Sequence, residues 1–469
     1  MTTTPASAIA LDLGSTSIKA GLLDPGGQLR NIVASPAPPV SVDGDRCESD
    51  ALAYAVIADQ VLHDCHAQTG GLPHFGMCSQ RSSFLIWERA SGQPLTPLIS
   101  WQDHRGASSC AALHAQENLI RELTGLRLTP YFFAPKLQVL LQEHLEWRAK
   151  LESGELLAGT LDTFLIWRWT AGVHHVTDVS MAARTLLLDI QQRQWSPRLC
   201  DLFDIPMGIL PRILPSAGIN LRLDNQLTLQ SSLGDQSAAL YASVGDRYAD
   251  VLINLGTGGF AIRNLPQAIA APDGYLRTLI LQDSQLRFHL GCEGTLNSIA
   301  AALAPYSLAE CRSEELASVD VFCIAEPSGI GAPYFRTEFG LHFSGPVDHL
   351  PPRLIATLLL EGIIFRIARI LEDFNRASAI ERAYLSGGLS EVSCLQQGLA
   401  LCVPFDVYRL QQRESSLQGA ALLASGMSPN ASNLAEKITV LHHIPALVQK
   451  YQRWKKWFDA LLNHNNNPT

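Results

Sequence analysis

Three glycine-rich turns carry residue types that can bind phosphate. They are Asp12–Ser17, Gly256–Gly259 and Gly387–Gly388. Glycine and other small residues let backbone N–H groups approach phosphate oxygens closely, and the hydroxyl groups of Thr16 and Thr257 could add hydrogen bonds. Each turn alone could equally be an ordinary hairpin turn. Because the pattern recurs, the turns are candidates for nucleotide binding.

Two aspartates add the groups that phosphoryl transfer needs. Asp12 ends an apolar segment, where its carboxylate could hold Mg²⁺ directly or through water, or could simply close its turn. Asp235 leads the small-residue segment Gln236–Ala242. An ordinary aspartate is ionised at neutral pH and can accept the proton of an attacking hydroxyl. Asp235 could instead cap the helix, and one residue can serve both roles.

Two other classes of nucleotide-binding protein are excluded by their motifs. The chain has no G-x-x-x-x-G-K-[ST] segment, so it is not a Walker-type NTPase. The turn Gly256–Gly259 leads into the apolar segment Phe260–Arg263 rather than into a helix. This order argues against a Rossmann dehydrogenase, in which the glycine-rich turn opens a helix.

The composition of the whole chain narrows its class further. The 469 residues are 47% hydrophobic and 17% charged, which is typical of a soluble globular protein of two or three domains. Lys and Arg number 35 against 44 Asp and Glu, so the net charge is 35 − 44 = −9. A negative chain lacks the basic surface of a general nucleic-acid binder, and we expect no nucleic-acid partner.

Targeting signals and cysteine spacing favour the cytoplasm. Residues 1–13 show no basic region followed by a long apolar run, and no apolar stretch approaches 18 residues. We therefore expect neither a signal peptide nor a membrane partner. The ten cysteines never occur as C-x-x-C, so metal-site spacing is absent and buried, reduced thiols are expected.

Two similar hairpins indicate two similar domains. Apolar segments flank the first turn at Ala8–Leu13 and Ile18–Leu23, and others flank the second at Val251–Leu255 and Phe260–Arg263. Each set predicts a glycine-turned β-hairpin. Since one hairpin opens each half of the chain, we predict an α/β protein with two similar domains facing one another.

Helical periodicity places further elements between the hairpins. The predicted helices are Ala51–His63, Lys136–Leu151, Gln236–Ala242, Gly294–Leu303, Arg353–Asn375 and Ala446–Leu462, and Ala383–Leu385 is a predicted strand. The domain boundary is expected near Ser243–Ala249, which gives domains 1–245 and 246–469.

An ordered series of motifs along nearly the whole chain resembles the FGGY carbohydrate kinases of the actin/hexokinase superfamily, closest to their glycerol kinase branch. Asp12–Ser17 and Gly256–Gly258 resemble the two phosphate motifs, Gly234–Leu240 resembles the catalytic motif, and Ser386–Gly388 resembles the adenosine motif. The remaining matches are Ser79–Arg81, Ile99–Arg105, Pro130–Phe132 with Lys136–Leu137, Gly329–Tyr334 and Tyr451–Lys456. Each motif is weak alone, and their common order carries the resemblance.

The resemblance implies a fold and an activity. The fold would be two ribonuclease H-like domains of the actin/hexokinase type with a cleft between them. The activity would be ATP-dependent phosphorylation of a hydroxyl group on a small sugar or polyol, with Mg²⁺. Residues 1–245 would hold the substrate and the first phosphate motif, and residues 246–469 would bind the nucleotide. Family members are often dimers or tetramers, so a homo-oligomer is a further expectation.

The resemblance also implies a role for each candidate residue. Asp235 would be the general base and Asp12 the Mg²⁺ anchor. The substrate residues would be Arg81, Ser82, Trp101, Tyr131, Asp235, Gln236 and Phe260, with Arg81 and Gln236 binding hydroxyl groups and the three aromatic rings forming apolar walls. The ATP-binding residues would be Gly14, Ser15, Thr16, Ser17, Gly256, Thr257, Gly329, Gly387 and Gly388.

Two departures from the glycerol kinase pattern leave alternatives open. Ser82 stands where glycerol kinases carry a glutamate, and loss of a buried acceptor is worth about 1–3 kcal/mol. This change favours a longer polyol or a ketose, whereas Arg81, Trp101, Tyr131 and Phe260 together favour glycerol. Val392–Ser393 replaces the asparagine pair after the adenosine glycines. The alternative function is therefore a nucleotide-binding sensor of the same fold with little or no catalytic activity.

Overall fold

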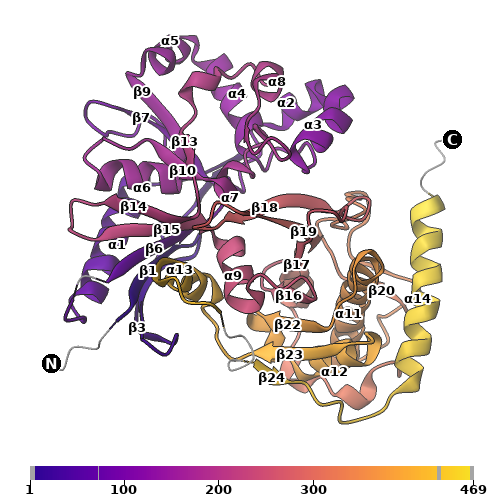
Figure 1. Ribbon diagram of the computed structural model, residues 1–469. Coiled ribbons are helices and arrows are strands. Elements are labelled where there is room, and N and C mark those ends of the chain that lie inside the picture. The colour runs from indigo at the N-terminus through magenta and orange to yellow at the C-terminus, as the bar shows by residue number, and fades with distance from the viewer. Residues whose placement is uncertain (1–5, 72, 430–434, 465–469) are drawn as a thin grey trace. The chain divides into compact units, whose positions relative to one another are not determined.

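The computed structural model describes residues 6–71, 73–429 and 435–464, and they divide into two compact units (Figure 1). The first unit comprises Met1–Gly245, Arg277–Leu290 and Glu414–Asn430. The second unit comprises Asp246–Leu276, Gly291–Arg413 and Ala431–Thr469. Two segments after residue 245 thus belong to the first unit. The division expected from the sequence, with one boundary after residue 245, does not include them in it.

A six-stranded mixed sheet forms the centre of the first unit. Its order is β14-β15-β6-β1-β2-β3, in which β15, β6 and β1 run parallel and the remaining neighbours are antiparallel. The strands are β1 Ala8–Leu13, β2 Ser17–Leu23, β3 Leu29–Pro36, β6 His74–Ser79, β14 Ala217–Arg222 and β15 Thr228–Gly234. The predicted first hairpin is present as β1 and β2.

The alternation of residues along β1 explains why both faces of this sheet are covered. Ile9 and Leu11 lie in one core with Tyr54 of α1, Ala51–His66, whose first turn is capped by the Asp50 carboxylate. Ala8 and Ala10 lie in a second core with residues of α13, Ser415–Ser425. In Figure 1 the gold helix α13 lies against the much earlier strands β1 and β6.

Small residues make this late helix fit the early sheet. A Cβ atom on Gly76 of β6 would lie 2.3 Å from the carbonyl oxygen of Ala420, and one on Gly419 would lie 1.9 Å from that of Ala238. Both glycines therefore allow backbone contact that a side chain would prevent. This close packing joins α13 to the first unit and to α9, Asp235–Val244.

Further elements complete the first unit. A five-stranded sheet has the order β4-β5-β8-β7-β9, with strands Ser41–Asp43, Arg46–Ser49, Leu98–Ile99, Phe84–Glu88 and Leu156–Thr160. The helices are α2 Ala107–Ala112, α3 Glu117–Thr124, α4 Phe133–Glu143, α5 Leu145–Ser153, α6 Leu161–Trp169, α7 Val179–Ala182 and α8 Pro197–Leu202. Two short pairs join β10 Val176–Asp178 to β13 Arg212–Leu214, and β11 Leu188–Asp189 to β12 Gln194–Trp195.

A seven-stranded sheet of order β18-β19-β17-β16-β22-β23-β24 carries the second hairpin. Its strands are β16 Asp250–Leu255, β17 Gly259–Leu265, β18 Leu276–Gln282, β19 Phe288–Leu296, β22 Arg382–Ser386, β23 Asp406–Leu410 and β24 Ala435–Lys437. The outer part of the β18–β19 hairpin, Arg277–Leu290, is grouped with the first unit. A short pair joins β20 Cys323–Ile324 to β21 His342–Phe343.

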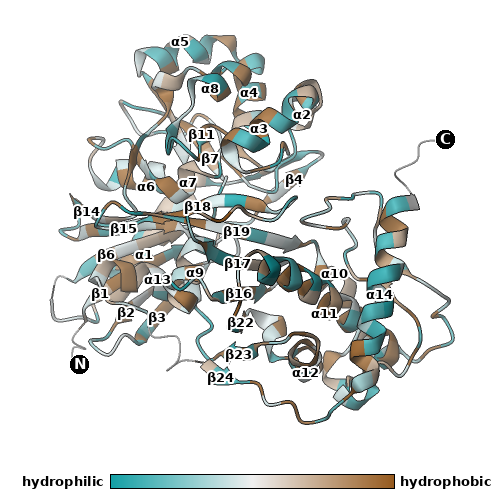
Figure 2. Cartoon of the chain, turned by 45° about the vertical axis from the view of Figure 1, so that its right-hand side comes forward, coloured by the Kyte–Doolittle hydropathy of each residue, from teal (hydrophilic) through white to brown (hydrophobic). Residues whose placement is uncertain are grey.

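Helices of the second unit include the long helix α11, Pro352–Ala377, and the C-terminal helix α14, Pro445–His464. Figure 2 shows hydrophilic and hydrophobic residues interspersed along α14. Its buried residues Leu447, Tyr451, Trp454 and Phe458 recur at helical spacing, so one face packs while the other stays polar. The other helices are α10 Ile299–Leu303 and α12 Ser393–Cys402.

Two helix predictions were wrong in part. The predicted helix Gly294–Leu303 begins only at Ile299, because residues up to Leu296 continue strand β19. A Cβ atom on Gly294 would lie 2.7 Å from Ile370 of α11, so this strand packs closely on that helix. The predicted helix over residues 136–151 is two helices, because His144 has a non-helical backbone, with φ −131° and ψ 76°.

Among the residues the structure describes, no helix is both long and apolar enough to cross a membrane. All ten cysteines are free thiols, and seven of them are buried.

Candidate active site

The carboxyl ends of three parallel strands bring the catalytic candidates of the first unit together. In the pairing register, Leu13 of β1 lies opposite Ser79 of β6, and Ser79 lies opposite Gly234 of β15. The chain therefore leaves all three strands at one edge of the sheet, directly before Gly14, Gln80 and Asp235, and Arg81 is the next residue after Gln80. In open α/β sheets this edge is where ligands bind.

At this edge Arg81 and Asp235 form an ion pair. The Nε atom of Arg81 lies 3.6 Å from Oδ1 of Asp235; the arginine side chain is 4% exposed and the aspartate side chain 26% exposed. A Cβ atom on Gly234 would lie 2.9 Å from Cδ of Arg81, so the glycine leaves room for the arginine. The pair combines a buried cation with a carboxylate that solvent and ligand can reach.

Asp235 begins helix α9 rather than capping it. The N-cap residue is Gly234, and Oδ1 of Asp235 accepts a hydrogen bond from its own neighbour, Gln236 N–H, at 2.7 Å. The alternative of Asp235 as the capping residue is therefore wrong. The predicted substrate residue Gln236 lies directly beside the predicted base.

Asp12 lies in the electrostatic field of Asp235. Burial raises the pKa of the Asp12 carboxyl to about 7, and the negative charge of Asp235 adds to that rise. Within the described part of the chain, Oδ1 of Asp12 is shielded from solvent and has no hydrogen-bond partner. A bound cation would supply the partner that this oxygen lacks.

These features fit a Mg²⁺ ion whose ligands come mainly from phosphate and water rather than from the protein. Among the described residues no three His, Cys, Asp or Glu side chains gather as a metal site. Mg²⁺ commonly takes one or two carboxylates and completes its shell with phosphate oxygens and water. Asp12 could therefore contribute one contact to the ion of a magnesium–nucleotide complex.

A hydrogen-bond chain joins the first phosphate loop to the substrate segments. The hydroxyl of Tyr54 donates to Gly14 O at 2.9 Å and accepts from the Gln80 side chain at 2.8 Å. The Ser83 hydroxyl donates to Gln80 Oε1 at 2.8 Å and accepts from Trp101 N–H at 3.0 Å. Tyr54 and Ser83 were not predicted, since nothing in the local sequence distinguishes them from core residues.

The loop itself is tight. Gly14 N–H donates to Ser17 O at 3.2 Å, and a Cβ atom on Gly14 would lie 2.8 Å from that oxygen. The loop therefore needs glycine where it begins, and Ser15 and Thr16 lie at its tip.

Two of the predicted aromatic walls lie together. The ring centroids of Trp101 and Tyr131 are 5.4 Å apart. Ser82, beside Arg81, is buried with φ 67°, and its hydroxyl donates to Arg184 O at 3.1 Å. The third predicted wall, Phe260, lies on β17 of the second unit, where it pairs with Asn254 of β16.

A buried lysine donates hydrogen bonds to the backbone of two predicted substrate segments. Lys136 is fully buried, and its ammonium group donates to Ser100 O at 2.8 Å and to Ser82 O at 3.5 Å. Burial lowers the pKa of Lys136 to about 7, although the nearby carboxylate of Asp103 opposes that shift. The lysine thus holds the backbone directly beside Arg81 and Trp101.

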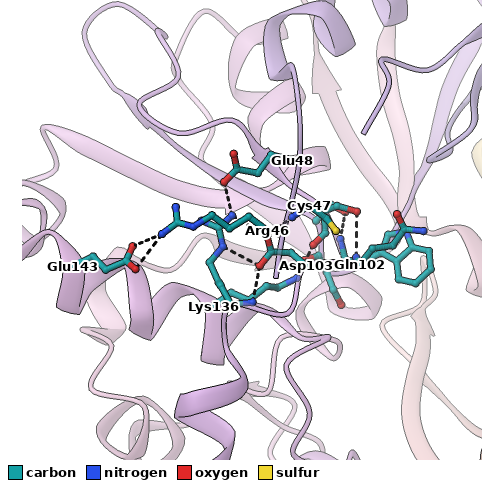
Figure 3. A network of polar contacts seen from close by, with 12 residues as sticks. Arg46, Cys47, Glu48, Gln102, Asp103, Lys136 and Glu143 are labelled. Atoms are coloured by element: carbon teal, nitrogen blue, oxygen red, sulfur yellow. Dashed lines mark hydrogen bonds and ion pairs between the residues drawn. The ribbon is translucent and has the colours of Figure 1, made fainter. Parts of the chain in front are cut away.

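Figure 3 shows Lys136 next to the buried carboxylate of Asp103. Asp103 accepts hydrogen bonds from Cys47 N–H at 2.7 Å and from the Arg105 guanidinium at 2.8 Å, and Arg105 also pairs with Glu48. The sequence motifs assign Lys136 no role. The sequence does hold a signal of this supporting role, since the lysine stands in the otherwise apolar segment 132–137. A lysine is rarely buried unless it has a partner, so its position in that segment indicates a buried polar contact.

Two of the predicted nucleotide-binding turns begin at the same edge of the sheet in the second unit. Strands β16 and β22 are parallel neighbours, with Asn254 opposite Ser386. Gly387 has φ +86°, and a Cβ atom there would lie 2.4 Å from Leu255 O, so the second turn packs on the start of the first. Within the described ranges, and apart from the adjoining residues, no atom lies within 4 Å of a Cβ atom added to Gly256 or Gly388, which leaves room there for a ligand.

The third predicted segment of the second unit is held by a buried ion pair. Gly329 has φ +95°. Glu326 accepts from Gly331 N–H at 2.8 Å and from Asn297 N–H at 2.9 Å, and its other oxygen lies 2.7 Å from Nε of Arg366. Both charged side chains are buried. Sequence reasoning missed this pair, because its partners are 40 residues apart.

Comparison with known proteins identifies the family of the chain. The model for the N-terminal domain of the FGGY family of carbohydrate kinases matches residues 7–241, and the model for the C-terminal domain matches residues 251–427. The chain is 29% identical to an apulose kinase of Pectobacterium atrosepticum, over 95% of this chain and 96% of that protein. It is 30% identical to a glycerol kinase of Cereibacter sphaeroides, over 97% and 99% of the two chains.

Solved structures show the same fold. The glycerol kinase of Plasmodium falciparum with ADP has a TM-score of 0.84 at 20% identity, covering 98% of this chain and 99% of that one. The ligand-bound xylulose kinase of Lactobacillus acidophilus has a TM-score of 0.81 at 18% identity, covering 97% and 98%. The predicted two-domain α/β fold of the actin/hexokinase type is confirmed. The chain belongs to the FGGY family of carbohydrate kinases, which are phosphotransferases.

Proposed function

We propose that this protein transfers the γ-phosphoryl group of ATP to a hydroxyl group of a small sugar or polyol, with Asp235 as the general base. The observation that supports this most is the Arg81–Asp235 pair, 3.6 Å apart, at the carboxyl edge of three parallel strands with Asp12 beside it. The pair holds a carboxylate that ligand and solvent can reach beside a buried cation, and a general base must be within reach of the proton that it removes.

The proposed step needs little covalent help from the protein. A substrate oxygen forms a bond to the γ-phosphorus as the bond from that phosphorus to ADP breaks, and the hydroxyl proton passes to the carboxylate of Asp235. Positioned base catalysis of this kind contributes about 10²–10⁴-fold to a rate. Arg81, which pairs with the base, and Gln236, which follows it in the chain, would bind the substrate hydroxyl groups and align the attacking oxygen.

The nucleotide would be held by the glycine-rich turns. Gly14, Ser15, Thr16 and Ser17 would contact phosphate in the first unit, with Gly256, Thr257, Gly329, Gly387 and Gly388 as the contacts of the second. Mg²⁺, anchored by Asp12, would neutralise phosphate charge when it is bound with ATP. Asp12 is suited to this role because its shielded oxygen lacks a partner within the described residues.

The acceptor would be a polyol or ketose somewhat longer than glycerol. Trp101 and Tyr131 offer apolar faces that suit the carbon side of a sugar. The Ser82 hydroxyl is engaged with Arg184 O and brings no carboxylate to the site, so an acceptor for two hydroxyl groups is missing. Apulose kinase among the relatives and xylulose kinase among the structures are consistent with such a substrate. The free thiols fit a cytoplasmic location.

A coupled ADP-release assay over glycerol, longer polyols and ketoses such as xylulose and ribulose tests the proposal. We expect magnesium- and ATP-dependent release with at least one acceptor, and a higher kcat/KM for a five-carbon compound than for glycerol. If no acceptor gives release while ATP still binds, the protein is a nucleotide-binding sensor and the proposal fails.

A further inference from the structure

A hydrogen bond holds the backbone immediately before the proposed base. Gly234 N–H donates to Oγ of Ser180 at 2.8 Å. Ser180 lies on α7, 54 residues earlier in the chain, and its side chain is buried. The contact is therefore a tertiary one, made at the point where strand β15 gives way to helix α9.

The Ser180 hydroxyl is fixed in direction by Asp178. Oγ of Ser180 donates its one proton to Oδ1 of Asp178 at 2.9 Å, so its lone pairs are left to accept from Gly234. The Asp178 carboxylate also accepts from Ser180 N–H and Met181 N–H, each at 2.9 Å, and from the Ser216 hydroxyl at 2.5 Å. With four hydrogen bonds and 1% exposure, this carboxylate has a single orientation.

The residue type at position 234 explains why a hydrogen bond is needed to fix the backbone there. A side chain at position 234 would force Arg81 to move, because a Cβ atom there would lie 2.9 Å from Cδ and 3.0 Å from Cγ of that arginine. Glycine has the greatest intrinsic backbone freedom, so the residue before the proposed base lacks the restriction that a side chain would impose. The hydrogen bond that Gly234 N–H donates to Ser180 Oγ restricts the backbone at this point and holds the direction in which Asp235 leaves the strand.

We propose that Ser180, oriented by Asp178, is a positioning residue for Asp235. This inference rests on the proposed function, in which Asp235 is the base. A displacement of about 1 Å in a reacting group can cost on the order of 100-fold in rate. Removal of the Ser180 hydroxyl should therefore lower kcat while leaving the binding of ATP unchanged.

Ser216 supplies a matched control. Like Ser180, it is buried and its hydroxyl donates a hydrogen bond to Asp178. Gly234 N–H donates to Ser180 Oγ, whereas Ser216 Oγ accepts from Gln282 N–H at 3.1 Å. Ser216→Ala and Ser180→Ala each remove one hydroxyl group from the same carboxylate. A purely structural role for this cluster predicts similar effects of the two variants, whereas positioning predicts a large kcat effect only for Ser180→Ala.

The experiment measures kcat and both KM values of the full chain with the acceptor identified by the panel, beside thermal unfolding of each variant. We expect Ser180→Ala to lower kcat about 10- to 100-fold with the KM for ATP unchanged, and Ser216→Ala to stay within about threefold of the parent. Added to Asp235→Asn, Ser180→Ala should lower the residual rate by no more than about twofold, since it acts through that carboxylate.

Three results overturn the inference in distinguishable ways. Full kcat in folded Ser180→Ala, with Asp235→Asn inactive, rejects positioning and leaves the base assignment standing. Equal losses in Ser180→Ala and Ser216→Ala indicate a structural role. Full turnover of Asp235→Asn rejects the base and the positioning of it together.

Discussion

Replacement of Lys136 by methionine perturbs both the stability of the first unit and the substrate segments. The change removes a fully buried ammonium group and its hydrogen bonds to Ser100 O and Ser82 O. The charged and polar groups facing the ammonium are Asp103, Arg105 and Cys47. Methionine keeps nearly the same length without a charge, so the variant isolates the effect of the ammonium group.

The difference in the free energy of unfolding between the parent and Lys136→Met should increase with pH. The pKa of Lys136 falls from 10.5 in the unfolded chain to about 7 in the folded one. Between these values the unfolded chain binds the extra proton, so the free energy of unfolding rises with pH, by about 1.4 kcal/mol per pH unit. From pH 7 to pH 9 this lysine should add roughly 2–3 kcal/mol to stability. The variant lacks that gain.

The lost hydrogen bonds act independently of pH. An unpaired buried carbonyl costs about 1–3 kcal/mol, which offsets the benefit of removing a buried charge near pH 7. We therefore expect parent and Lys136→Met to have similar stability at pH 7 and the parent to be clearly more stable at pH 9. Other titrating groups are common to both proteins and cancel in the difference.

Urea unfolding at pH 7 and pH 9, followed by tryptophan fluorescence, measures this difference. A parent-minus-variant difference that is equal at both pH values within about 0.5 kcal/mol refutes the reasoning, because no proton would then be linked to Lys136. Under the proposed function, the variant should also raise the KM for the acceptor about tenfold, a loss of about 1.4 kcal/mol, and leave the KM for ATP near the parent value.

Two further predictions concern the second unit. Gly387→Ala places a methyl group 2.4 Å from Leu255 O at a φ of +86°, so we expect a loss of about 2 kcal/mol or more in thermal or urea unfolding. Gly388→Ala meets open space and should change stability by less than about 1 kcal/mol; equal losses in both would contradict the packing. Glu326→Gln leaves the buried Arg366 without its counter-ion and should cost about 3–5 kcal/mol, whereas Asp204→Asn, which breaks a surface pair, should cost at most about 1 kcal/mol. A cost below about 1 kcal/mol for Glu326→Gln would show that the buried pair contributes little.

The glycine-turned hairpins could be predicted because their signal is local. Apolar segments on both sides of Gly14–Ser17 and Gly256–Gly258 leave few alternatives to a strand, a turn and a strand. The sequence order of the motifs then supplied the family and the position of Asp235. The helix predicted from Gly294 was wrong in its first residues, because a short apolar segment fits the pattern of a strand as well as that of a helix. The structure forms a strand there, which packs closely on α11 at Gly294.

The supporting residues could not be predicted because their partners are distant in the chain. Ser180 meets Gly234 across 54 residues, Lys136 meets Ser100 across 36, and Glu326 meets Arg366 across 40. Nothing beside Ser180 in the sequence indicates which amide its hydroxyl will accept from. Membership of α13 in the first unit also depends on tertiary packing, through the glycines at its contact with β6 and α9.

The most direct test of the central claim is the turnover of Asp235→Asn under saturating ATP, Mg²⁺ and acceptor. The substitution keeps an oxygen that can accept from Gln236 N–H but removes the negative charge beside the buried guanidinium of Arg81, so the variant should fold with reduced stability. Thermal unfolding and ATP binding are therefore measured beside turnover, and ATP affinity should stay near the parent value. If Asp235 is the base, kcat falls about 10²–10⁴-fold. A folded variant that keeps kcat within about threefold of the parent would contradict the account, since proton removal would then not depend on this carboxylate.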